Sequence, residues 1–227
     1  MVTEAIIGIV APLLGTACGA ASTLLMKRKI SERTNEIFIA ITLGVMLAAT
    51  VSLISACEET LPLAVGFAVG VVIMLALELL TKLSGEKRMA LAITVHNVPE
   101  GMAVGAAFAA ALACENGVAA AISLSVGIAV QNIPEGAVVG LMFRERGKLK
   151  CFLYGTATGA VEPIFAVITL LFSFAVSAAL PYLLAFSAGA MVYVCLRELA
   201  PQVNSPKGAG AACLAFIIML IVDCALG

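Results

Sequence analysis

Long runs of apolar residues make up most of this 227-residue chain, and runs of this length predict membrane-spanning helices. A run of about 20 apolar residues is long enough to cross, as a helix, the roughly 30 Å hydrocarbon core of a bilayer. Only 12% of the residues are charged, against about a quarter in soluble proteins. The pattern predicts an all-α integral membrane protein with eight spans, at about 4–26, 37–57, 61–81, 89–114, 117–143, 151–179, 181–200 and 208–227.

The connections between these runs are short, which predicts one transmembrane domain over residues 1–227 without a soluble module. The first run follows Glu4 and lacks a basic segment before it, so it is expected to remain as a span and not to be removed as a signal peptide. The seven cysteines form no CxxC pair and are interpreted as small apolar residues. No basic cluster indicates a nucleic-acid partner, and the lipid bilayer is the expected environment.

The thirteen lysines and arginines predict the orientation of the chain. All of them fall on alternate connections, beginning with the one between the first and second spans. Basic residues accumulate on the cytoplasmic side of membrane proteins, so both termini are expected outside the cytoplasm. The opposite connections carry Glu58, Glu59 and Glu115, interpreted either as solvated loop acids or as a weak attractor for cations.

Two copies of one polar motif interrupt the fourth and fifth spans. The first copy is His96-Asn97-Val98-Pro99-Glu100-Gly101, and the second is Gln131-Asn132-Ile133-Pro134-Glu135-Gly136. At 1.5 Å per residue, Glu100 lies roughly 16 Å and Glu135 roughly 12 Å from the cytoplasmic edge. Glu162 in the sixth span comes out at roughly 16 Å. Three carboxylates from three helices are therefore predicted at one level near the middle of the membrane.

The spacing within each copy places its polar side chains on one helix face. His96 and Glu100 are four residues apart, and so are Gln131 and Glu135. The asparagine of each copy precedes the glutamate by three residues, so each glutamate is able to bridge two neighbouring positions. A repeated motif on adjacent antiparallel spans also predicts an inverted repeat, which is typical of alternating-access carriers.

Prolines and glycines flank these polar groups. Each motif proline, and the proline after Glu162, removes a helical hydrogen bond; these are Pro99, Pro134 and Pro163. The carbonyl four residues earlier is left without its helical partner in each case, namely that of Val95, Val130 or Gly159. In a membrane such a carbonyl needs another partner. Small residues at four-residue spacing permit close helix approach, and the motif supplies Gly101, Gly105, Gly136 and Gly140.

Buried carboxylates require a counter-charge, and no lysine or arginine is expected at their depth. A bound cation is the simplest one; the alternative is that the motifs are proline kinks whose polar groups only bond across helices. Imidazole with carboxylates and amides suits zinc and also accepts cadmium, iron or manganese. An all-oxygen site would favour calcium or magnesium. Met46 in the second span either adds a thioether ligand or packs in the core.

At these residues the chain resembles the ZIP (Zrt/Irt-like) metal transporters, in particular their short prokaryotic members. The resemblance covers essentially the whole chain and rests on the twin motif, on Glu162-Pro163, and on the segment Arg197-Glu198-Leu199-Ala200-Pro201. It implies an eight-helix ZIP-like bundle in the cell membrane of a prokaryote. It also implies transport of a divalent metal into the cytoplasm by one helix bundle moving against another, commonly in a homodimer. The metal is the substrate, and no resident cofactor is predicted.

The resemblance further implies a binuclear metal centre between the fourth, fifth and sixth spans, with a contribution from the second. One position would use His96, Glu100, Gln131 and Glu135, together with Met46. The other would use Asn97, Asn132 and Glu162, with Glu100 and Glu135 bridging. Many family members have a histidine where this chain has Gln131, and some have an aspartate where it has Asn132.

Acidic residues outside the two motif copies carry further predictions, and functions other than metal transport by a carrier remain as alternatives. Glu78 and Glu198 are expected either on the exit path of the metal or as acids at the membrane interface, and Asp223 is expected at the interface. The alternative functions are a metal-ion channel and an ion-coupled carrier of a small organic solute. An enzyme is not predicted, because the histidine motif lacks the second histidine of HExxH.

Overall fold

The computed structural model describes residues 2–26, 30–81, 83, 85–112, 117–173 and 178–226. Regular secondary structure in these ranges is helical throughout. Some residues on which predictions rest lie outside the described ranges, namely Lys27, Arg28, Lys29, Lys82, Cys114 and Glu115.

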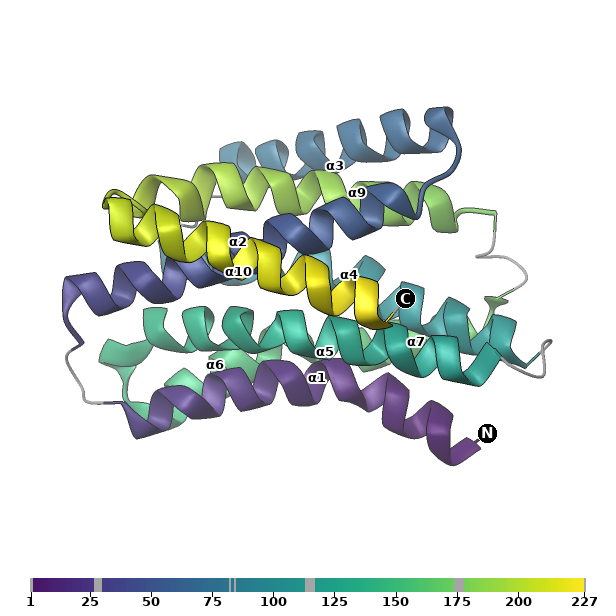
Figure 1. The fold of residues 1–227 in the computed structure, drawn as a ribbon, viewed down its shortest axis with the longest axis horizontal. Helices are drawn as coiled ribbons and strands as arrows, with labels where there is room; N and C mark the ends of the chain where they lie inside the picture. Colours follow the sequence, from purple (N-terminus) through teal and green to yellow (C-terminus); the bar gives the residue numbers. More distant parts are fainter. Residues whose placement is uncertain are drawn as a thin grey trace.

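Long helices run side by side along the molecule (Figure 1). They are α1 (Val2–Leu25), α2 (Glu32–Ser55), α3 (Thr60–Leu80), α4 (Glu86–Ala111), α5 (Gly117–Met142), the consecutive helices α6 (Lys148–Gly159) and α7 (Val161–Leu171), α9 (Leu180–Val194) and α10 (Pro206–Leu226). Short elements are the 3-10 helix η1 (Arg144–Arg146), the π-helix η2 (Cys195–Leu199) that continues α9, and the 3-10 helix η3 (Ala200–Gln202).

Seven helices of the described chain are long and apolar enough to cross a membrane, with α6 and α7 taken as one. The helix left out of this set is α4. Its 26 residues extend about 39 Å at 1.5 Å per residue, more than a bilayer core requires. The first motif copy lies in α4 and makes this helix more polar than its neighbours. The chain is a multi-pass membrane protein, and the eighth span stays a prediction.

The helix limits follow the predicted spans closely except in the sixth, which was expected over 151–179. Here α6 begins at Lys148, the helix is interrupted at Ala160, and α7 ends at Leu171. Residues 174–177 of that predicted span lie outside the described ranges. The interruption has a local cause, because Pro163 has no N–H to bond the carbonyl of Gly159. By contrast, α4 and α5 continue through their prolines.

The helices pack in two groups, which we call the motif bundle (α1, α4, α5, α6 and α7) and the flanking bundle (α2, α3, α9 and α10). In the motif bundle, α1 packs along α5 and α6, while α4 packs against α7 and α5. In the flanking bundle, α3 packs against α9, and α2 packs against α10 and α9. The groups meet mainly where α4 contacts α9 and where α2 contacts α5.

Glycines of the motif bring the helices of the motif bundle into close contact. A Cβ atom at Gly101 would overlap the backbone of Glu162 in α7, and one at Gly136 would overlap the backbone of Thr16 in α1. Gly105 lies equally close to the backbone of Ala166. The prediction that small residues permit close helix approach is confirmed, and the approach at Gly101 brings α7 against the first motif copy.

Side chains from separate connections meet at one end of the molecule. Arg146 of η1 pairs with Glu86 at the start of α4, and Arg88 in the same turn of α4 pairs with Glu198 of η2. Figure 1 shows the α9–α10 connection at the left end and both chain termini towards the right. The topology of the termini and the membrane face that they occupy stay predictions.

Candidate metal centre

The two motif copies and Glu162 meet inside the motif bundle. Their polar side chains come from α4, α5 and α7 and are all buried, with at most 6% of any residue exposed. The residues brought together are His96, Asn97, Glu100, Gln131, Asn132, Glu135 and Glu162.

The two motif copies contact each other reciprocally between α4 and α5. Nε2 of His96 lies 3.3 Å from Oε2 of Glu135. Nε2 of Gln131 donates a hydrogen bond to Oε1 of Glu100 at 2.9 Å. The first residue of each copy thus meets the glutamate of the other copy.

The asparagines connect the cluster to the surrounding helices. Nδ2 of Asn132 donates to Oε1 of Glu162 at 2.8 Å, and Nδ2 of Asn97 donates to the carbonyl of Thr158 at 3.3 Å. The side-chain amide nitrogen of each asparagine therefore donates a hydrogen bond within the protein, while its amide oxygen can accept another partner.

Six of these side chains keep one buried atom without a hydrogen-bond partner. The atoms are Nδ1 of His96, Oδ1 of Asn97, Oε2 of Glu100, Oδ1 of Asn132, Oε1 of Glu135 and Oε2 of Glu162. A buried polar atom without a partner costs about 1–3 kcal/mol, and more when it is charged. Five of the six are oxygens and the other is an imidazole nitrogen, which are all donor atoms that divalent transition metals accept.

Lysine and arginine side chains do not supply the counter-charge for the buried carboxylates among the described residues. Within the described part of the chain, no hydrogen bond or ion pair joins Glu100, Glu135 or Glu162 to a lysine or arginine. The arginines of the described residues that form ion pairs do so at the end that carries η1 and η2.

Amides bond two of the three carboxylates. Among the described residues, no three histidine, cysteine, aspartate or glutamate side chains stand close enough together to hold a metal ion. Gln131 holds one oxygen of Glu100, and Asn132 holds one oxygen of Glu162. A metal ion bound at about 2.0–2.2 Å to these two bonded oxygens would replace the hydrogen bonds, whereas the second oxygen of each carboxylate has no partner.

A cavity of about 480 Å³ reaches the cluster from one end of the molecule. Glu100 and Gln131 line it at the cluster, and Ala56, Leu180 and Leu226 line it near helix ends. Most of the other lining residues are apolar, and alanines predominate. The cluster is therefore accessible from the end towards which the termini lie.

Two polar residues in the wall of this cavity were not predicted to act together. Asp223 of α10, expected at the membrane interface, lines the cavity and accepts a 2.7 Å hydrogen bond from the hydroxyl of Ser52 in α2. Asp223 is an isolated charged residue in an apolar span, which is the sequence signal that was available.

Two hydroxyls of the flanking bundle bond the backbone of the motif helices. Ser187 of α9 donates to the carbonyl of His96 at 3.1 Å, and Thr42 of α2 donates to the carbonyl of Pro134 at 3.2 Å. Sequence reasoning pointed to the carbonyls of Val95 and Val130 instead. The hydroxyls themselves were missed, because a lone serine or threonine in an apolar span gives no indication of its partner.

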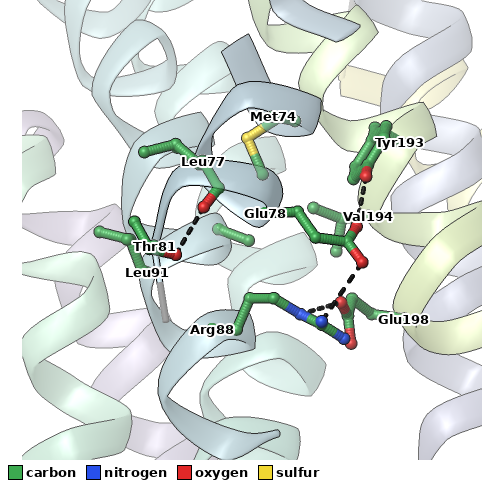
Figure 2. Close-up of a pocket in the computed structure, with 10 residues that line it drawn as sticks. Met74, Leu77, Glu78, Thr81, Arg88, Leu91, Tyr193, Val194 and Glu198 are labelled. Atoms are coloured by element: carbon green, nitrogen blue, oxygen red, sulfur yellow. Dashed lines mark hydrogen bonds and ion pairs between the residues drawn. The ribbon is translucent and has the colours of Figure 1, made fainter. Parts of the chain in front are cut away.

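The remaining predicted residues lie apart from these contacts. Met46 is fully buried in an apolar cluster that also contains Ile93 and Val139, and its role as a ligand stays a prediction. Figure 2 shows Glu78 and Glu198 beside Arg88, close to the start of α4. Both acids are paired with arginine in this conformation.

Comparison with known proteins adds an independent line of information. The family model described as ZIP zinc transporter matches residues 88–221. Zinc transporter ZIP11 of Homo sapiens is 40% identical over 149 residues, which cover 61% of this chain and 43% of that protein. The protein of the same name from Bos taurus is 42% identical over 149 residues, with 61% and 43% covered, and that from Xenopus tropicalis is 42% identical, with 61% and 44% covered.

The chain spans less than half the length of these curated relatives. The relatives are vertebrate proteins, so the predicted prokaryotic origin stays a prediction. The matched segment, which is more than half of the chain, contains both motif copies and Glu162. On this match and the helical membrane fold around it, the chain belongs to the ZIP zinc transporter family.

Proposed function

We propose that this protein carries divalent transition-metal ions, with zinc as the main substrate, across the membrane into the cytoplasm. The observation that carries the proposal is the group of six buried donor atoms without hydrogen-bond partners on α4, α5 and α7. Ionisable residues inside a membrane protein typically mark the path of an ion. The names of the relatives, which are zinc transporters, support zinc as the ion.

The proposed centre is binuclear. The first position takes its ligands from His96, Glu100, Gln131 and Glu135, with Met46 as an additional thioether. The second takes Asn97, Asn132 and Glu162, and the glutamates of the two motif copies bridge both positions. In support of bridging, Glu100 and Glu135 each have one oxygen in an interhelical contact and one without a partner.

Metal binding is proposed to replace interhelical hydrogen bonds by coordination bonds. The ion enters through the cavity, loses water, and draws the carboxylates of Glu100 and Glu162 away from their amide partners. Gln131 then turns its amide oxygen towards the metal, while Asn132 already has a free oxygen. Because carboxylate ligands must be deprotonated, binding releases protons.

Transport is proposed to follow an alternating-access scheme in which the motif bundle moves against the flanking bundle. In the present conformation a large cavity leads to the cluster from one end. At the other end, buried apolar residues fill the space between the bundles, including Met74, Met89 and Val194. A conformation open at one end only is a state that the alternating-access scheme requires.

The proposed topology has eight spans, with α4 as the span that hydropathy alone does not identify. Both ends of this chain then lie outside the cytoplasm, and the end that carries Arg88 and Arg146 faces the cytoplasm of the cell. The metal is substrate and not a resident cofactor. A homodimer in the plasma membrane is the proposed assembly.

Zinc uptake into proteoliposomes tests this function. The full chain is expected to give saturable uptake, and Glu100→Gln, which keeps the side-chain volume, is expected to lower it by about tenfold or more. The matched control is Glu145→Gln at an exposed position of η1, which is expected to leave uptake unchanged. Wild-type uptake no greater than that of empty liposomes would reject zinc transport. Competition with cadmium, iron and manganese, with and without a pH gradient, then ranks the substrates.

A further inference from the structure

A network of ion pairs lies beside the start of α4 (Figure 2), at the opposite end of the molecule from the large cavity. Nε of Arg88 lies 2.7 Å from Oε1 of Glu198, and Nη1 of Arg88 lies 3.3 Å from Oε1 of Glu78. Glu78 also accepts hydrogen bonds from Arg197 at 2.6 Å and from the hydroxyl of Tyr193. One guanidinium group thus stands between two carboxylates.

The members of this network belong to different bundles. Glu78 is in α3, Tyr193 is in α9, and Arg197 and Glu198 are in η2, which continues α9. All four residues therefore move with the flanking bundle. Arg88 is in α4 of the motif bundle, so its two ion pairs cross between the bundles, whereas the pair of Arg197 with Glu78 stays within one bundle.

The network lies between the metal-ligand cluster and one end of the molecule. Arg88 precedes His96 by eight residues on the same helix, which is about 12 Å at 1.5 Å per residue. The pocket beside Arg88 has a volume of about 10 Å³, roughly the least that holds one water molecule. By contrast, the cavity on the other side of the cluster measures about 480 Å³.

The residues of the two Arg88 ion pairs are less exposed to solvent than those of an ordinary surface ion pair. Side-chain exposure is 24% for Arg88, 16% for Glu78 and 12% for Glu198. Arg197 is 52% exposed by the same measure. Ion pairs between one guanidinium group and two partly buried carboxylates are screened less by solvent than a single exposed pair is.

We propose that Arg88 is a latch that keeps this end of the protein closed by binding Glu78 and Glu198 across the bundle interface. The bundles cannot separate at this end until Arg88 leaves both carboxylates. While the latch holds, the cluster is accessible only through the large cavity. The assignment of the closed end to the cytoplasm rests on the proposed function, but the latch itself rests on the contacts across the bundles.

Hydrogen–deuterium exchange of the purified full chain in lipid nanodiscs tests the latch without requiring transport. Arg88→Gln removes both cross-bundle ion pairs and is expected to raise amide exchange about threefold in peptides covering residues 86–95 and 191–202. The matched control is Arg197→Gln, which removes an ion pair to the same Glu78 within the flanking bundle. It is expected to leave exchange in residues 86–95 unchanged.

A variant in which the two charges are exchanged distinguishes loss of the ion pair from a general folding defect. The double variant Arg88→Glu with Glu198→Arg restores an ion pair of opposite polarity across the bundles, and it is expected to return exchange towards the wild-type rate. Equal effects of Arg88→Gln and Arg197→Gln, or no effect of either, would overturn the latch. So would a double variant that exchanges faster than Arg88→Glu alone.

Uptake measurements separate the latch from the proposed function. If Arg88 stabilises the conformation that is open to the large cavity, Arg88→Gln raises the zinc concentration for half-maximal uptake about threefold. Absence of uptake in the wild-type protein would reject zinc transport while the exchange experiment still decides on the latch. Normal uptake with an unchanged exchange pattern in Arg88→Gln would reject the latch and leave the transport proposal intact.

Discussion

Gln131 donates a hydrogen bond to Glu100 at 2.9 Å, in the place where the opposite motif copy sets His96 against Glu135. The two contacts are equivalent in position and different in chemistry. An amide nitrogen is a donor only, whereas a neutral imidazole has an electron pair on the ring nitrogen that carries no proton. The metal preference of the cluster is therefore expected to depend on residue 131.

Gln131→His is expected to strengthen zinc binding, because imidazole is a better zinc ligand than a neutral amide. Zinc should then compete about tenfold better against manganese in uptake assays. Gln202→His adds a histidine at an exposed position of η3 and serves as the control. An unchanged zinc-to-manganese ratio in Gln131→His would exclude Gln131 from the ligand set.

Glu162→Gln is expected to remove the second metal position and to retain the first. Glu162 contacts Asn132 and no other side chain of the two motif copies by hydrogen bonding, so its loss leaves the contacts of His96 and Glu100 in place. The measurement is the number of zinc ions bound per chain, by equilibrium dialysis and elemental analysis. A drop from two ions to one is expected, and two ions bound to Glu162→Gln would contradict the binuclear proposal.

Gly101→Ala is expected to destabilise the protein and to displace Glu162. The added methyl group would overlap the carbonyl oxygen of Glu162, which is a backbone atom and moves only with α7. Overpacking of this kind costs about 1–3 kcal/mol. Thermal unfolding in detergent measures the effect.

Gly210→Ala is the matched control for this substitution. No heavy atom lies within 4 Å of a Cβ atom built at Gly210, which is in α10. Alanine favours a helix by about 1 kcal/mol relative to glycine, so an unchanged or slightly higher unfolding temperature is expected. Equal unfolding temperatures for the two variants would show that the contact between α4 and α7 is not tight.

Ser187→Ala is expected to cost about 1 kcal/mol of stability, because the carbonyl of His96 loses its hydroxyl partner in the interior. Ser22→Ala is the control, since the hydroxyl of Ser22 bonds only the carbonyl of Gly19 in its own helix. Chemical unfolding in mixed micelles compares the two. A loss no larger in Ser187→Ala than in Ser22→Ala would mean that the contact between the bundles contributes nothing to stability.

Local sequence patterns predicted the helices and the composition of the cluster. The length of apolar runs determines helices that cross a bilayer, and four-residue spacing determines that His96 and Glu100 share a face. The depth of each residue follows from the constant rise of a helix, which is why Glu162 was expected beside the two motif copies. Its hydrogen bond with Asn132 agrees with that expectation.

The end of the sixth span and the hydroxyl partners were not predictable in this way. The apolar character of the chain continues beyond Leu171, where α7 ends, so composition gave no indication of the limit. Ser187 and Thr42 lie in apolar runs far along the chain from the carbonyls that they bond. Only the packing of α9 and α2 on the motif helices selects those partners.

By itself, the sequence determined the helical membrane fold, the twin motif and the helix face that the polar side chains of each copy share, because these depend on spacing along single helices. The tertiary structure decided which atom of each side chain is bonded and which is left without a partner. It also decided that the cavity opens at one end and that Arg88 joins two acids of the other bundle at the opposite end. These features arise from the packing of helices against one another, and a linear pattern does not specify the atoms that face each other across two helices.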